Sequence, residues 1–102
     1  MYTDFQKKVW RACRRIPKGK VTTYKLLAKA INRPKASRAV GQALNKNPFA
    51  PAVPCHRVIK SDGRVGGFAF GKRRKMFLLK KEGLETVNDK IVRYKTHLVK
   101  FR

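Results

Sequence analysis

Hydrophobic residues recur at helical spacing near the start of the chain. The apolar positions of this first segment are Phe5, Val9, Trp10, Cys13 and Ile16. Thr3, followed three residues later by Gln6, forms a capping box that starts a helix, and Pro17 and Gly19 end it. The pattern therefore predicts a helix from Thr3 to the residue before Pro17. Because Cys13 falls on the apolar face, we expect it to be a packed, unreactive thiol.

Two shorter amphipathic segments follow. Thr22 or Thr23 can cap a helix that ends near Asn32, with Tyr24, Leu27, Ala28 and Ile31 on one face. After the turn at residues 32–34, the segment from Ser37 to Asn45 predicts a third helix with inward residues Ala39, Val40, Ala43 and Leu44. Two short helices joined by a tight turn indicate either a helix-turn-helix or an ordinary helical hairpin.

Prolines and glycines divide the second half of the chain into short elements. The prolines of residues 47–56 predict a loop, which leads into a short strand at residues 57–59 and a turn at residues 61–63. A glycine-rich loop then precedes a fourth helix from Lys72 to Glu82, with Gly83 as its C-cap. Asn88-Asp89 can turn a hairpin from residues 85–87 into residues 91–92. The predicted fold is mainly α with short strands, in one domain over residues 1–102.

The charge balance points to a negatively charged partner. The 102 residues carry 27 Lys and Arg against 5 Asp and Glu, a formal net charge of +22. No carboxylate occurs between Phe5 and Ser61. Nucleic acid is the natural partner for such a surface, and the alternative is a solvated basic face as in small ribosomal or chromatin-like proteins. An anionic membrane fits less well, because the basic residues are not gathered on one amphipathic stretch.

Several classes of protein do not fit this sequence. No apolar run is long enough to span a membrane, and the N-terminus lacks the pattern of a secretion signal. We therefore expect a cytoplasmic protein, associated with the nucleoid if prokaryotic, whose Cys13 and Cys55 are free thiols. Two cysteines with His56 and His97 far apart in sequence do not make a metal site, and we expect no cofactor.

Candidate chemistry concentrates at Cys55-His56-Arg57. The reactive form of cysteine is the thiolate, which nearby cations and a base favour. In extended backbone the side chains of Cys55 and His56 would diverge, so His56 would act through a water. Glu82 is the carboxylate that we expect to orient His56. Spacing alone leaves open a buried structural cysteine beside a surface histidine.

Several motifs together resemble a known family. Pro54-Cys55-His56-Arg57-Val58-Ile59 resembles the acceptor site of O6-alkylguanine-DNA alkyltransferases, the methylated-DNA–protein-cysteine methyltransferases. Residues 33–44 with Asn47-Pro48 resemble the recognition helix and asparagine hinge of that family, residues 21–24 resemble the start of its preceding helix, and Glu82-Gly83 match its glutamate. The resemblance covers residues 1–84, leaves 85–102 as a tail, and implies a winged helix-turn-helix-like alkyltransferase C-terminal domain.

The resemblance implies a methylated-DNA–[protein]-cysteine S-methyltransferase that reacts once. Cys55 would take the alkyl group of O6-alkylguanine irreversibly. His56 would deprotonate Cys55 through a water, and Glu82 would orient His56. Tyr24 would donate to guanine N3, and Asn47 would hold the loop that carries Cys55.

The resemblance also implies how this protein would bind its partner, double-stranded DNA that contains O6-alkylguanine. The recognition helix would lie in the minor groove, and Arg38 would enter the stack in place of the flipped base. The expected DNA contacts are Tyr24, Lys25, Arg33, Lys35, Ser37, Arg38, Gly41 and Ser61. The expected pocket residues are Leu44, Val58, Phe68 and Ala69, with the carbonyls of Cys55 and Val58 accepting the exocyclic amine of guanine and the Ala69 amide binding O6. We expect a monomer that can bind DNA cooperatively.

Two departures from the family pattern shape the expectations. Most members carry an N-terminal domain, and because this chain begins at the first helix of the DNA-binding domain, we expect no zinc site of that domain. Its brevity is similar to the alkyltransferase-like proteins, which bind alkylated guanine without repair and carry tryptophan where this chain has Cys55. The thiol favours repair, and the alternative is a non-catalytic lesion-recognition or architectural DNA-binding protein. Phe68 replaces a common tyrosine, so we expect a narrower pocket with poor activity on bulky adducts.

Overall fold

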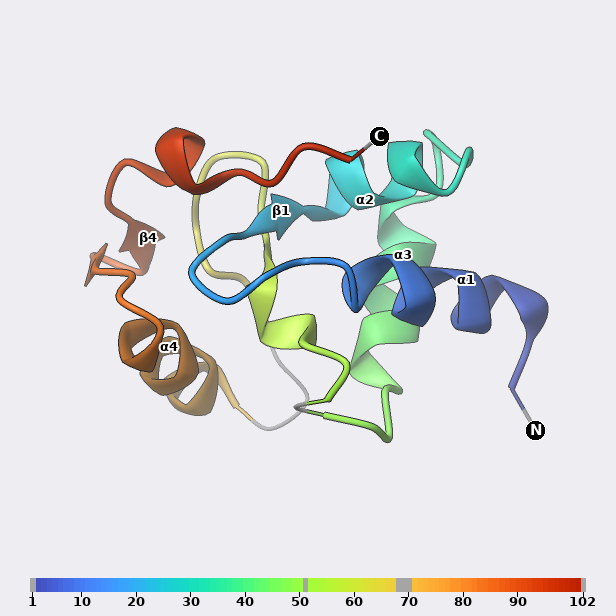
Figure 1. The fold of residues 1–102 in the computed structure, drawn as a ribbon, viewed down its shortest axis with the longest axis horizontal. Helices are drawn as coiled ribbons and strands as arrows, with labels where there is room; N and C mark the ends of the chain where they lie inside the picture. Colours follow the sequence, from blue (N-terminus) through green and yellow to red (C-terminus); the bar gives the residue numbers. More distant parts are fainter. Residues whose placement is uncertain (1, 51, 68–70, 102) are drawn as a thin grey trace.

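The computed structural model describes residues 2–50, 52–67 and 71–101. The described chain is mainly helical with short strands, as the sequence predicts. Helices α1 (Asp4–Cys13), α2 (Tyr24–Ala30) and α3 (Ser37–Asn45) pack together, and α4 (Lys72–Lys81) lies at the opposite end of the molecule (Figure 1). The segment that carries Cys55 runs between these two parts, so it contacts both.

Helix α1 begins as predicted and ends one turn early. The Thr3 hydroxyl accepts from the Gln6 amide at 3.0 Å, and the Gln6 side chain accepts from the Thr3 amide at 2.9 Å. The helix stops at Cys13, after which the Arg15 and Ile16 amides bond three residues back. Helical backbone is disfavoured at the residue before a proline, which explains why Ile16 lies outside the helix. Its side chain is nevertheless buried.

Helices α2 and α3 form the helix-turn-helix. The Thr23 hydroxyl caps α2 by accepting from the Leu26 amide at 3.0 Å, and Asn32 leaves the helix with a positive φ of 61°. Helix α3 has the predicted bounds. The prediction that Ala39 points inward is wrong: Ala39 is exposed, because the buried face of this short helix is narrow and consists of Val40, Ala43 and Leu44. The Trp10 indole of α1 donates to the Ala43 carbonyl at 2.9 Å.

The segment after the proline-rich loop differs from the predicted strand. Residues Cys55–Arg57 form a single 3-10 turn, η1, in which the Arg57 amide donates to the Pro54 carbonyl at 2.9 Å. Only β2 (Val58–Ile59) is extended, and it pairs in parallel with β1 (Thr22–Thr23), with Thr22 opposite Val58. This pairing places the start of α2 beside the segment that carries Cys55.

The last part of the chain folds back onto the first. Strands β3 (Thr86–Val87) and β4 (Lys90–Ile91) form an antiparallel hairpin, and both turn residues between them have positive φ, as a type I′ turn requires. After η2 (Tyr94–His97), the Val21 amide donates to the His97 carbonyl at 2.9 Å and the Val99 amide donates to the Val21 carbonyl at 2.8 Å. The tail therefore runs beside the segment that leads into β1 (Figure 1).

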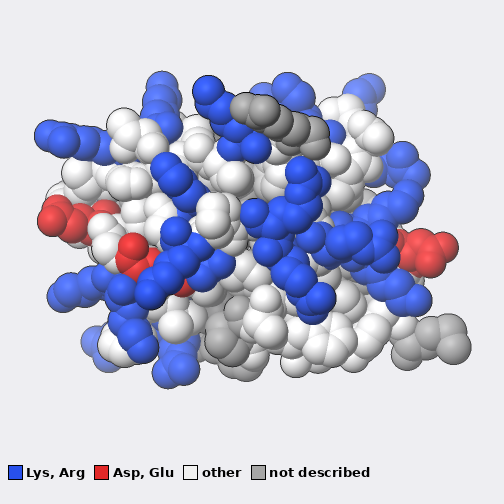
Figure 2. All heavy atoms as spheres, viewed as in Figure 1, with Lys and Arg blue, Asp and Glu red and all other residues white. Residues whose placement is uncertain are grey.

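The surface of the molecule is strongly basic. Lys and Arg side chains cover much of the face in Figure 2, and acidic side chains occupy only small areas of it. In the described ranges, no helix has the length and apolar character needed to cross a bilayer.

Candidate active site

Cys55 lies at the start of η1 in a loop that Asn47 holds closed. The Cys55 side chain is buried, and its amide donates to the Val53 carbonyl at 2.9 Å. The Asn47 amide group donates to the same carbonyl at 2.9 Å, and its oxygen accepts from the Phe49 amide at 2.9 Å. The buried Asn47 side chain thus spans the loop, as a residue that fixes the position of Cys55 must.

The environment of Cys55 favours the protonated thiol. Burial raises the pKa of Cys55 above its ordinary value, while a hydrogen bond from Asn47 and the charge of Lys75 lower it less strongly. The expectation that nearby cations favour the thiolate is therefore wrong in its net direction, because desolvation outweighs them. Cys13 is a free, fully buried thiol whose pKa burial raises to about 12, as expected of an unreactive residue.

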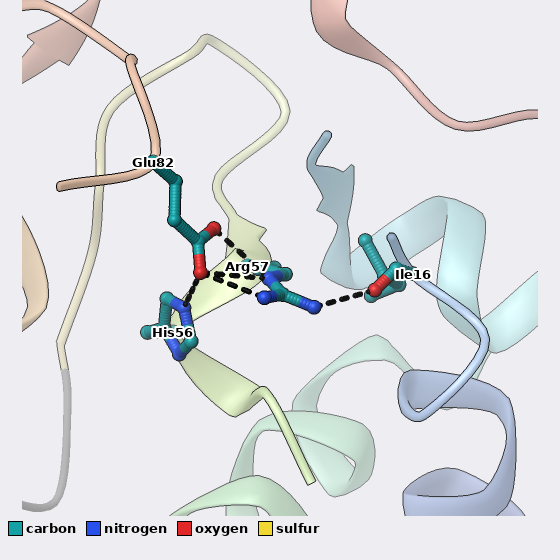
Figure 3. A network of polar contacts seen from close by, with 4 residues as sticks. All are labelled: Ile16, His56, Arg57 and Glu82. Carbon is teal, nitrogen blue, oxygen red and sulfur yellow. Dashed lines mark hydrogen bonds and ion pairs between the residues drawn. The ribbon is translucent and has the colours of Figure 1, made fainter. Parts of the chain in front are cut away.

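His56, Arg57 and Glu82 form one polar network (Figure 3). His56 Nε2 lies 3.0 Å from Glu82 Oε2, which is the pairing expected from the sequence. Arg57 donates from Nε to Glu82 Oε1 at 2.9 Å and from Nη2 to Oε2 at 2.7 Å. Its Nη1 donates to the Ile16 carbonyl at 2.7 Å. The network joins η1 to the residue that follows α4 and to the segment after α1.

Burial and the charges in this network together set the protonation state of His56. Burial lowers the pKa of His56 below its ordinary value, against the opposing effect of Glu82. Burial alone would raise the pKa of Glu82, but hydrogen bonds from Arg57 and His56 hold it below its ordinary value. At neutral pH the imidazole is therefore neutral beside an anionic carboxylate. Nε2 carries the proton toward Glu82, which leaves the lone pair of Nδ1 to accept a proton.

Lys75 is the site residue that sequence reasoning missed. Its side chain is fully buried in α4, and Nζ donates to the Val58 carbonyl at 2.6 Å and to the Gly67 carbonyl at 3.2 Å. Burial lowers its pKa to about 8. The available signal was its spacing of four from Leu79, which places both residues on the inward face of the helix.

Tyr24 is the first residue of α2, and its hydroxyl lies in the same region. Lys75 Nζ lies 3.5 Å from that hydroxyl, and a Cβ added at Gly66 would lie 3.4 Å from it. The Tyr24 ring packs over Gly41 of α3, where an added Cβ would lie 3.8 Å from the ring. Burial raises the pKa of Tyr24, so the phenol is a proton donor at neutral pH.

The residues expected to contact DNA lie mostly on the outside of the helix-turn-helix. Arg38 is exposed on α3, and Ser37 and Gly41 of the same helix are half-buried. The other exposed candidates are Lys25 on α2, Arg33 and Lys35 in the turn, and Ser61. Ser61 lies in a separate turn, where its carbonyl accepts from the Tyr94 hydroxyl at 3.0 Å.

Comparison with known proteins identifies the family of this chain. The family described as 6-O-methylguanine DNA methyltransferase, DNA binding domain, matches residues 4–84. The chain belongs to this methyltransferase family. A methylated-DNA–protein-cysteine methyltransferase of Methanosarcina acetivorans is 57% identical over 81 residues, which are 79% of this chain and 52% of that protein. The chain thus spans about half the length of the curated relatives that it matches.

Two solved structures of protein–DNA complexes share the fold of this chain. The Mycobacterium tuberculosis OGT in complex with DNA superposes with a TM-score of 0.79 at 46% identity, covering 81% of this chain and 51% of that one. The S. pombe Atl1 in complex with damaged DNA containing O6-carboxymethylguanine gives a TM-score of 0.82 at 31% identity, covering 98% of this chain and 99% of that one. The winged helix-turn-helix-like alkyltransferase fold predicted from the sequence is therefore confirmed, and the chain is a member of a DNA-binding DNA repair family.

The expected guanine pocket of this methyltransferase-family chain is partly described. Leu44 and Val58 are buried in the same apolar cluster as Cys55. The Cys55 carbonyl accepts from the Val58 amide, and the Val58 carbonyl accepts from Lys75 Nζ at 2.6 Å. Phe68 and Ala69 lie outside the described residues. Within the described ranges, no group of three or more His, Cys, Asp or Glu side chains is placed to hold a metal ion.

Proposed function

We propose that this protein repairs DNA by irreversible transfer of the alkyl group of O6-alkylguanine to Cys55. One observation carries the proposal: a buried thiol directly precedes a neutral histidine that a partly buried carboxylate orients, in a chain of the methyltransferase family. In the reaction the Cys55 sulfur forms a bond to the alkyl carbon, and the bond from that carbon to guanine O6 breaks. The electron pair goes to the guanine, and the product is a thioether that the protein cannot reverse.

The thiol needs a base because burial keeps it protonated at rest. Nδ1 of His56 would take the thiol proton through a bridging water, and Glu82 would stabilise the imidazolium that forms. This division of roles is the one expected from the sequence. The hydrogen bonds of Asn47 support it, since they would hold the sulfur in line with the alkyl carbon.

The leaving guanine becomes negatively charged as the bond to carbon breaks. Tyr24 would donate its phenolic proton to guanine N3, since its raised pKa keeps the phenol protonated until charge develops on the guanine. Lys75, with Nζ 3.5 Å from the phenol, would stabilise the charge that remains on Tyr24. Lys75 therefore enters the proposal from the structure alone.

The helix-turn-helix would present the damaged base to this site. Chemistry at O6 requires the nucleotide outside the duplex, and the exposed Arg38 of α3 would fill the space that the flipped base leaves. The basic surface in Figure 2 would hold the phosphates. We propose a monomer that acts on double-stranded DNA with O6-alkylguanine in the cytoplasm or nucleoid.

Intact mass spectrometry tests the proposal. After incubation with an O6-methylguanine duplex the protein should gain the mass of one methylene, and after incubation with an unmodified duplex it should gain none. Cys55→Ser should abolish the gain, whereas Cys13→Ala, which removes the other buried thiol, should retain it. An unchanged mass with intact, lesion-specific binding would overturn the repair proposal and favour a lesion-recognition protein.

A further inference from the structure

The guanidinium of Arg57 has no role in the steps proposed above, yet it makes most of the contacts in Figure 3. Its three nitrogens bond both oxygens of Glu82 and the Ile16 carbonyl. The side chains of Arg57 and Glu82 are only 16% and 10% exposed, so solvent screens this pair weakly. A bidentate arginine–carboxylate pair that is shielded from solvent fixes the plane of the carboxylate.

We propose that Arg57 is a positioning residue for the alkyl transfer, which holds the Glu82 carboxylate in place and keeps His56 in its neutral, proton-accepting form. The inference rests on the proposed function, since it assigns Arg57 a part in activating Cys55.

The geometry supports the positioning part of the proposal. Glu82 follows the last turn of α4, where its side chain could adopt several rotamers. Arg57 donates hydrogen bonds to both carboxylate oxygens of Glu82. With the carboxylate held in this way, its Oε2 also lies 3.0 Å from His56 Nε2. Arg57 and His56 are neighbours in η1, so the carboxylate is held from the same rigid turn that carries the base. The bond to the Ile16 carbonyl anchors the guanidinium from the far side.

The charges support the second part of the proposal. The ionisable groups that act on His56 are Glu82, which favours the imidazolium, and Arg57 and Lys75, which disfavour it. Arg57 is the cation bonded to Glu82 itself, so it compensates the carboxylate that would otherwise keep His56 protonated. Loss of Arg57 would raise the pKa of His56, so a smaller fraction of the imidazole would be free to accept the proton of Cys55.

Two substitutions separate charge from geometry. Arg57→Gln removes the charge, and a rise of one unit in the pKa of His56 would leave about tenfold fewer neutral imidazoles at a pH below it. We therefore expect the single-turnover methyl transfer rate of Arg57→Gln to fall by up to about tenfold at the acid end of its pH–rate profile and to recover as the pH rises. Arg57→Lys keeps the charge but loses the planar fork, so its rate should fall at every pH while the His56 titration stays near that of the unchanged protein. Arg64→Gln, which removes an exposed arginine paired with Asp62, is the matched control.

The His56 titration is read by NMR on protein without DNA. The chain has only two histidines, so a His97→Asn background leaves His56 as the single imidazole signal. The inference is overturned if Arg57→Gln lowers the melting temperature but leaves both the His56 titration and the pH–rate profile unchanged, or if Arg57→Lys transfers at the full rate. If Arg57→Gln does not fold, the methyl transfer rate of Arg57→Lys tests the inference by itself: a reduced rate supports it, and the full rate overturns it. Absence of transfer by the unchanged protein would overturn the proposed function alone, because the titration still measures the effect of Arg57.

Discussion

The ammonium of Lys75 donates a 2.6 Å hydrogen bond to the backbone carbonyl of Val58. A lysine with no exposed surface is costly, because its charge has lost the solvation of water. The bond joins the middle of α4 to the strand that follows the Cys55 turn. The same ammonium lies 3.5 Å from the Tyr24 hydroxyl. Lys75 therefore has both a structural contact and a role in the proposed reaction.

Replacing Lys75 should therefore affect catalysis more than folding. Lys75→Met has similar volume and avoids the burial of a charge, so we expect a melting temperature close to that of the unchanged protein. Loss of a charged hydrogen bond that forms in the transition state is worth about 1.5–3 kcal/mol, so methyl transfer should slow by about tenfold or more. Single-turnover kinetics with Lys80→Met, an exposed position on the same helix, as control would check this. Equal rates for the two variants would contradict the role assigned to Lys75.

Lys75 should also make stability depend on alkaline pH. Its pKa is about 8 in the folded protein against an ordinary 10.5, so between these values the folded chain loses a proton that the unfolded chain keeps. Unfolding then takes up a proton, and rising pH favours the folded state. Relative to Lys75→Met, the unchanged protein should gain up to about 3 kcal/mol from pH 8 to 10.5. Urea unfolding of both proteins measures this difference, and a difference independent of pH would refute the assignment.

Asn47→Ala should weaken both the loop and the reaction. The substitution leaves the Phe49 amide and the Val53 carbonyl without the Asn47 side chain, and such a loss costs about 1–3 kcal/mol. Because the same loop carries Cys55, the rate of methyl transfer should fall as well. Asn45→Ala changes an exposed asparagine at the end of α3 and should leave both quantities nearly unchanged. Thermal unfolding and transfer kinetics together test this; full activity of Asn47→Ala would show that the loop needs no such support.

Salt should separate binding from chemistry. The basic surface predicts that the logarithm of DNA affinity falls linearly with the logarithm of salt concentration, as counterions return to the phosphates. The buried groups around Cys55 are poorly screened, so the transfer rate on bound DNA should change little. Fluorescence anisotropy and single-turnover rates at several salt concentrations measure the two quantities. Equal salt sensitivity would contradict this separation.

Local signals predicted the helices well. The Thr3 and Gln6 capping box and the bounds of α3 depend on neighbours within one or two turns, so the sequence contains all that determines them. The pairing of His56 with Glu82 was also expected, because the chain offers few carboxylates and the resemblance to the alkyltransferases pointed to one of them.

Features set by distant contacts were not predictable in the same way. Arg57, predicted to begin a strand, instead ends a 3-10 turn, and its bonds to Glu82 and Ile16 accompany that conformation. Charge counting gave the wrong direction for the pKa of Cys55, since a sequence shows nearby cations but not the loss of water. Lys75 was missed because lysine is almost never fully buried.

The two backbone bonds at Val21 bear on where this fold ends. The residues that match the family stop at 84, yet the amide and carbonyl of Val21 find their partners in His97 and Val99. A chain cut after Leu84 would keep the whole matching region and leave the entrance to β1 with two unpaired polar groups. Because β1 leads directly into Tyr24, the C-terminal residues 97–99 help to hold Tyr24 of the proposed reaction centre in place.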